Sequence, residues 1–399
     1  MTAITVAARI CGIVDHRRTA KLPVRRHGIA PEYLPGKPQK GRPVSDGELC
    51  LPYPDLLPTS RQQVRRDFTG RRLSRATESL AQQGDSALSA LAYGESDESP
   101  DTRPATGQRE HPAELDYQEH DRYFHVRRTR NMPGVAFITA LAMMHRAVLD
   151  NARDCGLSQL SSESLPQLSA GWETLLRYGA PAENGPAEPA VTEPAVTEPA
   201  RAETAQTGAT EAAARRWLLG HQYFFALMQG TIVGLNCFMQ ASASGDEADA
   251  DAALGVAAAF MRSSAAAFRF TCDFAPVDYD RLIRPAMAPP AVRPGFSGLQ
   301  TRDHAHLMGL FGEVRLMRAK IGGDRVGPAF ERFADATVEA YEAHELICAR
   351  FGGNVLPSLR MAARSGGRSV QPGVQVVRQM MRARLLALGC PAGGGAVDE

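Results

Sequence analysis

A histidine and a cysteine stand four residues apart near the C-terminal end of this 399-residue sequence. They are His344 and Cys348, in the stretch YEAHELICARFGG (341–353), which has helical spacing. Side chains four apart share one helix face and lie roughly 5–6 Å from each other. That separation is long for a close nucleophile–base pair, but it matches the distance from a haem iron to the porphyrin rim. We therefore predict His344 as an axial iron ligand and Cys348 as a single thioether anchor.

Two other interpretations of this pair stay open. Noncovalent haem b on His344 is the alternative cofactor, and the common attachment motif C-x-x-C-H is absent from the sequence. The pattern H-x-x-x-C is also short. A core histidine bonded to a carbonyl group beside an inert buried thiol would give the same spacing.

The elements that must position this pair are helices. Apolar residues recur at spacings of three and four in 303–321 and 328–351, as expected for helices with one buried face. Further helices are predicted after Pro133 and over 215–241, 250–272 and 374–388, and no convincing alternating strand pattern is present. We predict an all-α fold, a bundle of six or more helices with its site on facing helices.

Composition divides the chain into segments. We expect an irregular basic N-terminal segment over 1–60, a weak helix and linker over 61–112, and a catalytic helical domain over 113–390. Within that domain, 179–208 contains AVTEP twice in tandem, and such Pro- and Glu-rich sequence predicts a disordered insertion. Residues 391–399 are expected to form a flexible tail.

Charge and cysteine usage exclude several protein classes. The net charge of +1 gives no nucleic-acid or membrane signature. Seven scattered cysteines without a C-x-x-C pair favour a reducing compartment, so we expect a cytoplasmic protein. The most apolar run, 217–240, contains His221 and Gln229 among its polar residues, which favours a buried helix over a membrane span. We expect His221 and Tyr223 to be satisfied core residues rather than pocket groups.

Four segments carry a resemblance to a known family. They are YFHVRRTRNMPGVAFITALAMMHR (123–146), GHQYFFALMQGTIVGLNC (220–237), PGFSGLQTRDHAHLMGLFG (294–312) and the segment around His344. Together they resemble the histidine-ligated haem-dependent aromatic oxygenases of the tryptophan 2,3-dioxygenase superfamily. The branch they resemble most is the 3-methyl-L-tyrosine hydroxylases of saframycin-type biosynthesis, with the pattern H-x(n)-H-x-x-x-C and n near 38. The resemblance implies a tryptophan 2,3-dioxygenase-like helical bundle.

The resemblance also implies site residues. His306 and His304 lie 38 and 40 residues before His344, and one of them would be the opposite axial ligand. We favour His306, with His304 as the alternative. A second axial histidine fills the iron's last position, so it would have to leave when substrate or oxidant arrives. His125 would be a pocket hydrogen-bonding residue above the haem, or otherwise a surface histidine. Either the displaced His306 or His125 would be the catalytic proton shuttle for the oxidant.

The implied activity is ortho-hydroxylation of a tyrosine ring, most simply 3-methyl-L-tyrosine to 3-hydroxy-5-methyl-L-tyrosine. The oxidant would be hydrogen peroxide, or dioxygen with a reductant. One of Arg127, Arg128 and Arg130 could hold the substrate carboxylate. The alternatives are an L-tyrosine 3-hydroxylase and a non-catalytic bis-histidine haem sensor or electron-transfer protein. The expected partners are a small aromatic amino acid and the oxidant, and a homo-oligomer is possible.

Overall fold

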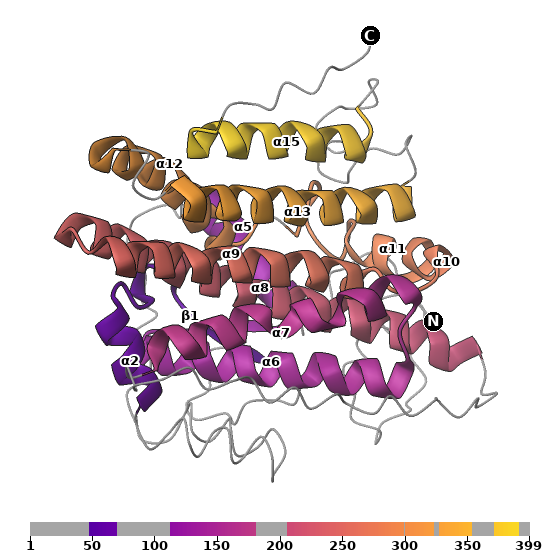
Figure 1. The fold of residues 1–399 in the computed structure, drawn as a ribbon. Coiled ribbons are helices and arrows are strands. Elements are labelled where there is room, and N and C mark those ends of the chain that lie inside the picture. Colours follow the sequence, from indigo (N-terminus) through magenta and orange to yellow (C-terminus); the bar gives the residue numbers. More distant parts are fainter. Residues whose placement is uncertain are drawn as a thin grey trace, which may run out of the picture.

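The chain folds as a layered bundle of helices in a computed structural model (Figure 1). The structure describes residues 48–69, 112–180, 206–298, 300–322, 327–352 and 371–390. The long helices are α6 (Pro133–Cys155), α7 (Gln159–Gly179), α8 (Gln206–Ser244), α9 (Glu247–Thr271), α12 (Arg302–Ile321), α13 (Gly327–Gly352) and α15 (Gly373–Leu388). The short elements are α2 (Arg61–Thr69), α5 (Pro112–Tyr123), α10 (Pro276–Asp278), α11 (Arg284–Ala286), a π-helical turn (Tyr279–Ile283) and a 3-10 turn (Pro54–Leu56). The predicted all-α class is confirmed.

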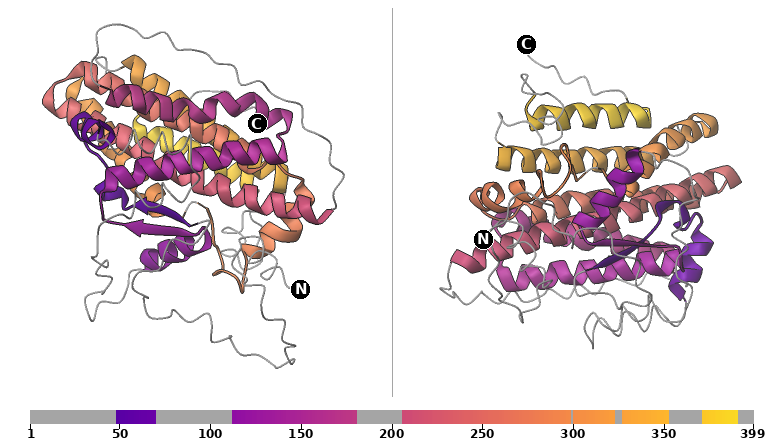
Figure 2. Two further views of the ribbon diagram at one scale, coloured as in Figure 1. Left: turned by 90° about the horizontal axis from the view of Figure 1, so that it is seen from below. Right: turned by 180° about the vertical axis from the view of Figure 1, so that it is seen from behind.

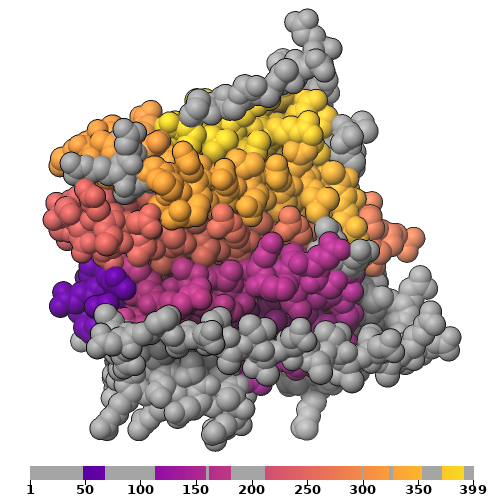
Figure 3. Space-filling model, in the orientation of Figure 1, coloured from indigo at the N-terminus to yellow at the C-terminus, as the bar shows by residue number. Residues whose placement is uncertain are grey.

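The long helices are stacked in order, with α15 on α13, α13 on α9, and α9 on α7 and α8 (Figure 1). Helix α12 packs against α8 and α15, and α6 packs against α8. Figure 3 shows α15, α13 and α9 as adjoining bands on one face. Helix α9 is therefore the centre of the bundle, and the predicted ligand helix α13 covers one side of it.

Small residues let α8 and α9 approach closely. A Cβ added at Gly234 would lie 2.7 Å from the backbone nitrogen of Ala257, so only glycine fits there. The ring of Phe260 fills the space beside Gly171 and Gly230 in the same way. Many buried positions of α9 are alanine. Because these side chains are short, α7, α8 and α13 can all pack closely against α9.

The predicted helices over 303–321 and 328–351 match α12 and α13 to within one residue at each end. Thr301 caps α12, because its side chain accepts a hydrogen bond from the backbone N–H of His304 at 2.8 Å. Helices α5 and α7 were not predicted. Helix α7 contains Pro166, which removes one backbone donor and hides the helical pattern.

Two short parallel strands correct the expectation that no strand forms. Strand β1 (Leu49–Pro52) pairs with β2 (Val126–Thr129), with Leu49 opposite Val126 (Figure 2, left). Leu49 and Leu51 are buried, so the end of the segment predicted as irregular over 1–60 is in fact ordered core. Four-residue strands carry too little alternation to be recognised in a sequence.

Several segment predictions fall on residues that are not described. Helix α7 ends at Gly179 and α8 begins at Gln206, and 181–205 lie outside the described residues, as do 1–47, 70–111 and 391–399. One helix of the described chain, Ala212–Ser244, is long and apolar enough to cross a membrane, but 78% of its apolar window is buried inside the protein. The six cysteines in the described ranges are all free.

Candidate active site

His344 lies on α13 with its ring against α9. It stacks on Phe268 with the ring centroids 5.1 Å apart and the planes at 8°. Neither ring nitrogen makes a hydrogen bond to another described residue, and desolvation lowers the pKa of His344 to about 4. The imidazole is therefore neutral, with a nitrogen lone pair that no protein donor takes. This is the state that an iron ligand requires.

Cys348 lies one turn further along the same face. It is partly buried, and burial raises the pKa of its thiol to about 11. Tyr279, in the π-helical turn, lies close enough to Cys348 for the thiol to influence its pKa. The ring of Tyr279 stacks on that of Phe351, with the centroids 4.4 Å apart. The thiol is thus neutral and partly buried, one helical turn from His344. Its position fits the predicted thioether anchor.

His221 on α8 is the neighbour of His344 that sequence reasoning had assigned to the core. Its Nδ1–H donates to the carbonyl oxygen of Trp217 at 2.8 Å, which leaves Nε2 with the lone pair. A Cβ at Gly298 would come within 3.3 Å of that Nε2. Desolvation lowers the pKa of His221 to about 4, and the nearby His344 lowers it further. This fixed tautomer is typical of a histidine that accepts a proton or ligates a metal.

His120 on α5 is the second histidine that sequence reasoning missed. Its side chain is fully buried, and its Nε2–H donates to the carbonyl oxygen of Gly298 at 3.2 Å. The ring lies 4.7 Å from Phe124, 5.0 Å from Phe225 and 5.8 Å from Phe296, centroid to centroid. Burial, followed by the proximity of His221, holds the pKa of His120 well below its ordinary value. His120 is therefore a neutral imidazole inside an aromatic cage.

The two candidate opposite ligands lie on different sides of α12. His304 lies close enough to His120 for its charge to lower the pKa of His120. No interaction links His306 to the other histidines in the part of the chain that the structure describes. The structure thus brings together His120, His221, His304 and His344, which we call the histidine group. The choice between His304 and His306 as a ligand stays a prediction.

His125 lies apart from the histidine group. It has a left-handed backbone conformation (φ 53°) between α5 and β2. Burial lowers the pKa of His125, and the nearby carboxylate of Glu48 partly offsets that shift. Phe124, one residue earlier, takes the place expected of His125, because its ring lies 4.7 Å from His120 and is stacked 4.6 Å from His221. His120 and His221, rather than His125, are therefore the histidines that lie among the aromatic rings of this region.

Arg128 is not available to a substrate carboxylate. It is buried and binds two carboxylates, those of Asp121 (2.9 and 3.0 Å) and Asp303 (2.7 and 3.1 Å). Gln229 also donates to Asp303 at 2.8 Å. Arg130 lies over the ring of Tyr53 at 4.6 Å, and the prediction for Arg127 stays untested.

This buried network anchors the elements that carry the histidine group. Asp121 follows His120 on α5, and Asp303 precedes His304 on α12. Gln229 lies two turns after His221 on α8, and it also donates to the Pro52 carbonyl at 2.9 Å. A charge network with every carboxylate paired fixes the relative positions of three helices.

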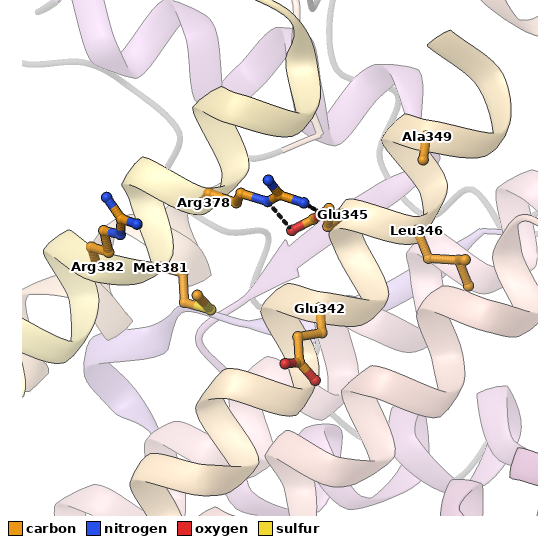
Figure 4. A pocket seen from close by; sticks show the side chains of 7 residues that line it. All are labelled: Glu342, Glu345, Leu346, Ala349, Arg378, Met381 and Arg382. Atoms are coloured by element: carbon orange, nitrogen blue, oxygen red, sulfur yellow. Dashed lines mark hydrogen bonds and ion pairs between the residues drawn. The ribbon is translucent and has the colours of Figure 1, made fainter. Parts of the chain in front are cut away.

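A separate groove lies on the outer face of α13, against α15 (Figure 4). It encloses about 490 Å³ and includes the ion pair of Arg378 with Glu345. Its α13 residues Leu346 and Ala349 are far around the helix from His344. The groove is therefore not part of the histidine group.

The haem-free protein is expected to lose stability as the pH falls from about 6.5 to about 4. The pKa values of His221 and His344 are about 4 in the folded chain, against an ordinary 6.5. Between these values the unfolded chain binds protons that the folded chain does not, so the free energy of unfolding falls with the pH. In urea titrations, His344→Phe should reduce this slope by up to about 1.4 kcal/mol per pH unit. Equal slopes in both proteins would contradict the buried neutral state.

Comparison with known proteins identifies the family. Residues 50–332 match the family model described as "SfmD 3-methyl-L-tyrosine peroxygenase", which is more than half of the chain. The chain belongs to this family. The match includes His120, His221 and His304, and it ends before His344 and Cys348, whose roles therefore rest on the local geometry.

Two relatives of the family agree with this assignment. A 3-methyl-L-tyrosine peroxygenase of Streptomyces lavendulae is 36% identical over 180 residues, 44% of this chain. That match spans 47% of the relative, about half its length. A crystal structure of reduced SfmD, soaked with sodium hydrosulfite, superposes with a TM-score of 0.51 at 23% identity, over 75% of this chain and 97% of the other. The second similarity supports the fold.

Proposed function

We propose that this chain hydroxylates the ring of 3-methyl-L-tyrosine at its free ortho carbon with hydrogen peroxide, using a bound haem. The product would be 3-hydroxy-5-methyl-L-tyrosine, and water would be the second product. The family match over residues 50–332 carries the proposal, because that family is described by this activity. The neutral, unbonded imidazole of His344 supports it independently.

His344 would hold the haem iron, and Cys348 would hold the porphyrin edge by one thioether. Among the described residues, no cluster of three or more His, Cys, Asp or Glu side chains could bind a metal ion. Haem needs no such cluster, because the macrocycle itself supplies four ligands and the protein adds one or two. His304 or His306 would be a second protein ligand of the haem. When bound, haem supplies the oxidising chemistry that peroxide requires.

His221 would move the proton. Because Nδ1–H is held by the Trp217 carbonyl, Nε2 can take a proton from hydrogen peroxide and return it to the oxygen that leaves as water. The rings of Phe124, Phe225 and Phe296 exclude water from this region and offer faces for a substrate ring. The chain thus supplies ligation, a proton relay and an apolar enclosure.

Cys348→Ser is expected to leave haem bound but exchangeable. His344 remains as ligand, while the thioether that prevents dissociation is lost. Mixing with excess apomyoglobin should draw haem from the variant within hours and from the parent protein not at all, as followed by the Soret band. Cys272→Ser is the matched control, since this buried thiol lies on a different element, at the C-cap of α9. Haem retained equally by both variants would assign the anchor to another residue.

Product analysis tests the proposed function. Haem-loaded protein is incubated with ¹⁸O-labelled hydrogen peroxide and either 3-methyl-L-tyrosine or L-tyrosine, and products are identified by mass spectrometry. We expect one labelled oxygen on the ring and a preference for the methylated substrate of roughly 10-fold or more, as one methyl group can give. Equal use of L-tyrosine would favour the tyrosine hydroxylase alternative. Absence of product from both would favour a non-catalytic haem protein.

A further inference from the structure

The buried ring of His120 has one nitrogen that can accept a hydrogen bond, and no described residue donates one to it. A carbonyl oxygen can only accept, so the bond to Gly298 requires a proton on Nε2 of His120. In the neutral ring Nδ1 then carries the lone pair. That atom is buried, and no described residue forms a hydrogen bond with it. Buried polar atoms are almost always paired in folded proteins, so an unpaired one indicates a missing partner.

The surroundings of His120 suit an aromatic partner. The ring of Phe124 is tilted against His120 and stacked on His221, and the rings of Phe225 and Phe296 pack against both His120 and Phe124. Among the described residues, the rings of Phe124, Phe225 and Phe296 lie within 5.8 Å of the ring of His120, centroid to centroid, and the nearby Arg128 is already paired with Asp121 and Asp303. A ligand that enters this cage must therefore be largely apolar and must present a hydrogen-bond donor, a combination that a phenol ring provides.

Gly298 joins the cage to the rest of the site. Its carbonyl oxygen holds His120, and the position of a Cβ on it would lie 3.3 Å from Nε2 of His221. The ring of Trp217 lies 4.2 Å from the ring of His221, and its buried indole N–H also has no hydrogen-bond partner among the described residues. Two unpaired buried atoms beside one proton-relay histidine mark this region as a ligand site.

We propose that Nδ1 of His120 accepts the hydrogen bond of the substrate's phenol O–H and makes the site selective for phenolic rings. The inference rests on the proposed function and adds a specificity-determining residue to it. Fixing the phenol oxygen also fixes which ring carbon lies beside it, so the neighbouring ortho carbon is held in a constant place. A ring without the hydroxyl would leave Nδ1 unpaired and would bind more weakly.

Paired ligands and paired variants test this inference. Dissociation constants of 3-methyl-L-tyrosine and 3-methyl-L-phenylalanine, which lacks the hydroxyl, are measured on haem-loaded protein by calorimetry. The parent protein should prefer the phenol by roughly 10-fold or more. In His120→Gln, whose amide can still donate to Gly298 but lacks an acceptor at the Nδ1 position, the preference should fall below about 3-fold. His120→Asn, with its amide at the Nδ1 position, should restore part of it.

The outcomes separate this inference from the proposed function. If the parent protein prefers the phenol and His120→Gln keeps that preference, the assignment of His120 is wrong and the activity stands. If the preference is lost in His221→Gln instead, the phenol belongs to His221. If the parent protein binds neither ligand and forms no product, the proposed function fails and this inference fails with it. Circular dichroism and haem content verify the folding of each variant, and His120→Asn provides the second test if His120→Gln does not fold.

Discussion

Replacing His344 with alanine is expected to abolish peroxide-driven hydroxylation, with a loss of more than about 100-fold. Residues that merely support a metal ligand change affinity or activity by about 10–100-fold, so loss of the ligand itself must cost at least as much. The ring of His344 is stacked on Phe268 and has no hydrogen bond to any described residue, so its ring nitrogen is available to bind the iron. The measurement is the rate of product formation together with the absorption spectrum of the haem.

Rescue by imidazole and a control variant distinguish loss of the iron ligand from general damage to the protein. His344→Ala leaves a space the size of an imidazole beside Phe268, so added imidazole should restore the spectrum and part of the activity. His125→Asn is the control, since asparagine tolerates the left-handed backbone at this position. It should change the rate less than about 3-fold, because His125 lies apart from the histidine group. Equal losses in both variants, without rescue by imidazole, would remove His344 from the site.

Replacing Asp303 with alanine is expected to destabilise the folded protein by about 3–5 kcal/mol, because it leaves the buried charge of Arg128 with one carboxylate fewer. Asp303 is fully buried, and its oxygens lie 2.7 and 3.1 Å from the Arg128 guanidinium. Removing it also leaves the amide of Gln229 without one of its two acceptors. Urea unfolding followed by circular dichroism measures the loss.

The exposed pair Arg378–Glu345 (Figure 4) is the control for Asp303→Ala. Because solvent screens it, Arg378→Met should leave the unfolding midpoint unchanged. Asp303→Ala should also alter the haem spectrum, since Asp303 begins the turn of α12 that carries His304. An unchanged midpoint in Asp303→Ala would show that the network does not hold the site together.

The helices that carry the site could be predicted because their signals are local. The apolar spacing of α12 and α13 lies within each helix, and Thr301 caps α12 from one turn away. The i, i+4 relation of His344 and Cys348 is equally local. Residues two apart on a helix point in nearly opposite directions, so only one of His304 and His306 can face a given neighbour, and in the structure His304 is the one near His120.

The rest of the site could not be predicted, because its partners are distant in sequence. His120 lies in a polar helix, PAELDYQEHDRY, and becomes buried only when Phe225 and Phe296 pack around it. Arg128 resembles a solvated residue among arginines until Asp303, 175 residues away, pairs with it. The polar His221 inside a strongly apolar helix was the one available signal, and it is equally compatible with a satisfied core residue.

The most direct test of a haem held by His344 and Cys348 is acid–organic solvent extraction of the purified haem-loaded protein, followed by mass spectrometry of the peptide that contains Cys348. We expect haem to stay with the protein and its mass to appear on that peptide. Haem that leaves freely into the organic phase, with an unmodified Cys348 peptide, would contradict the thioether and indicate an ordinary haem b site.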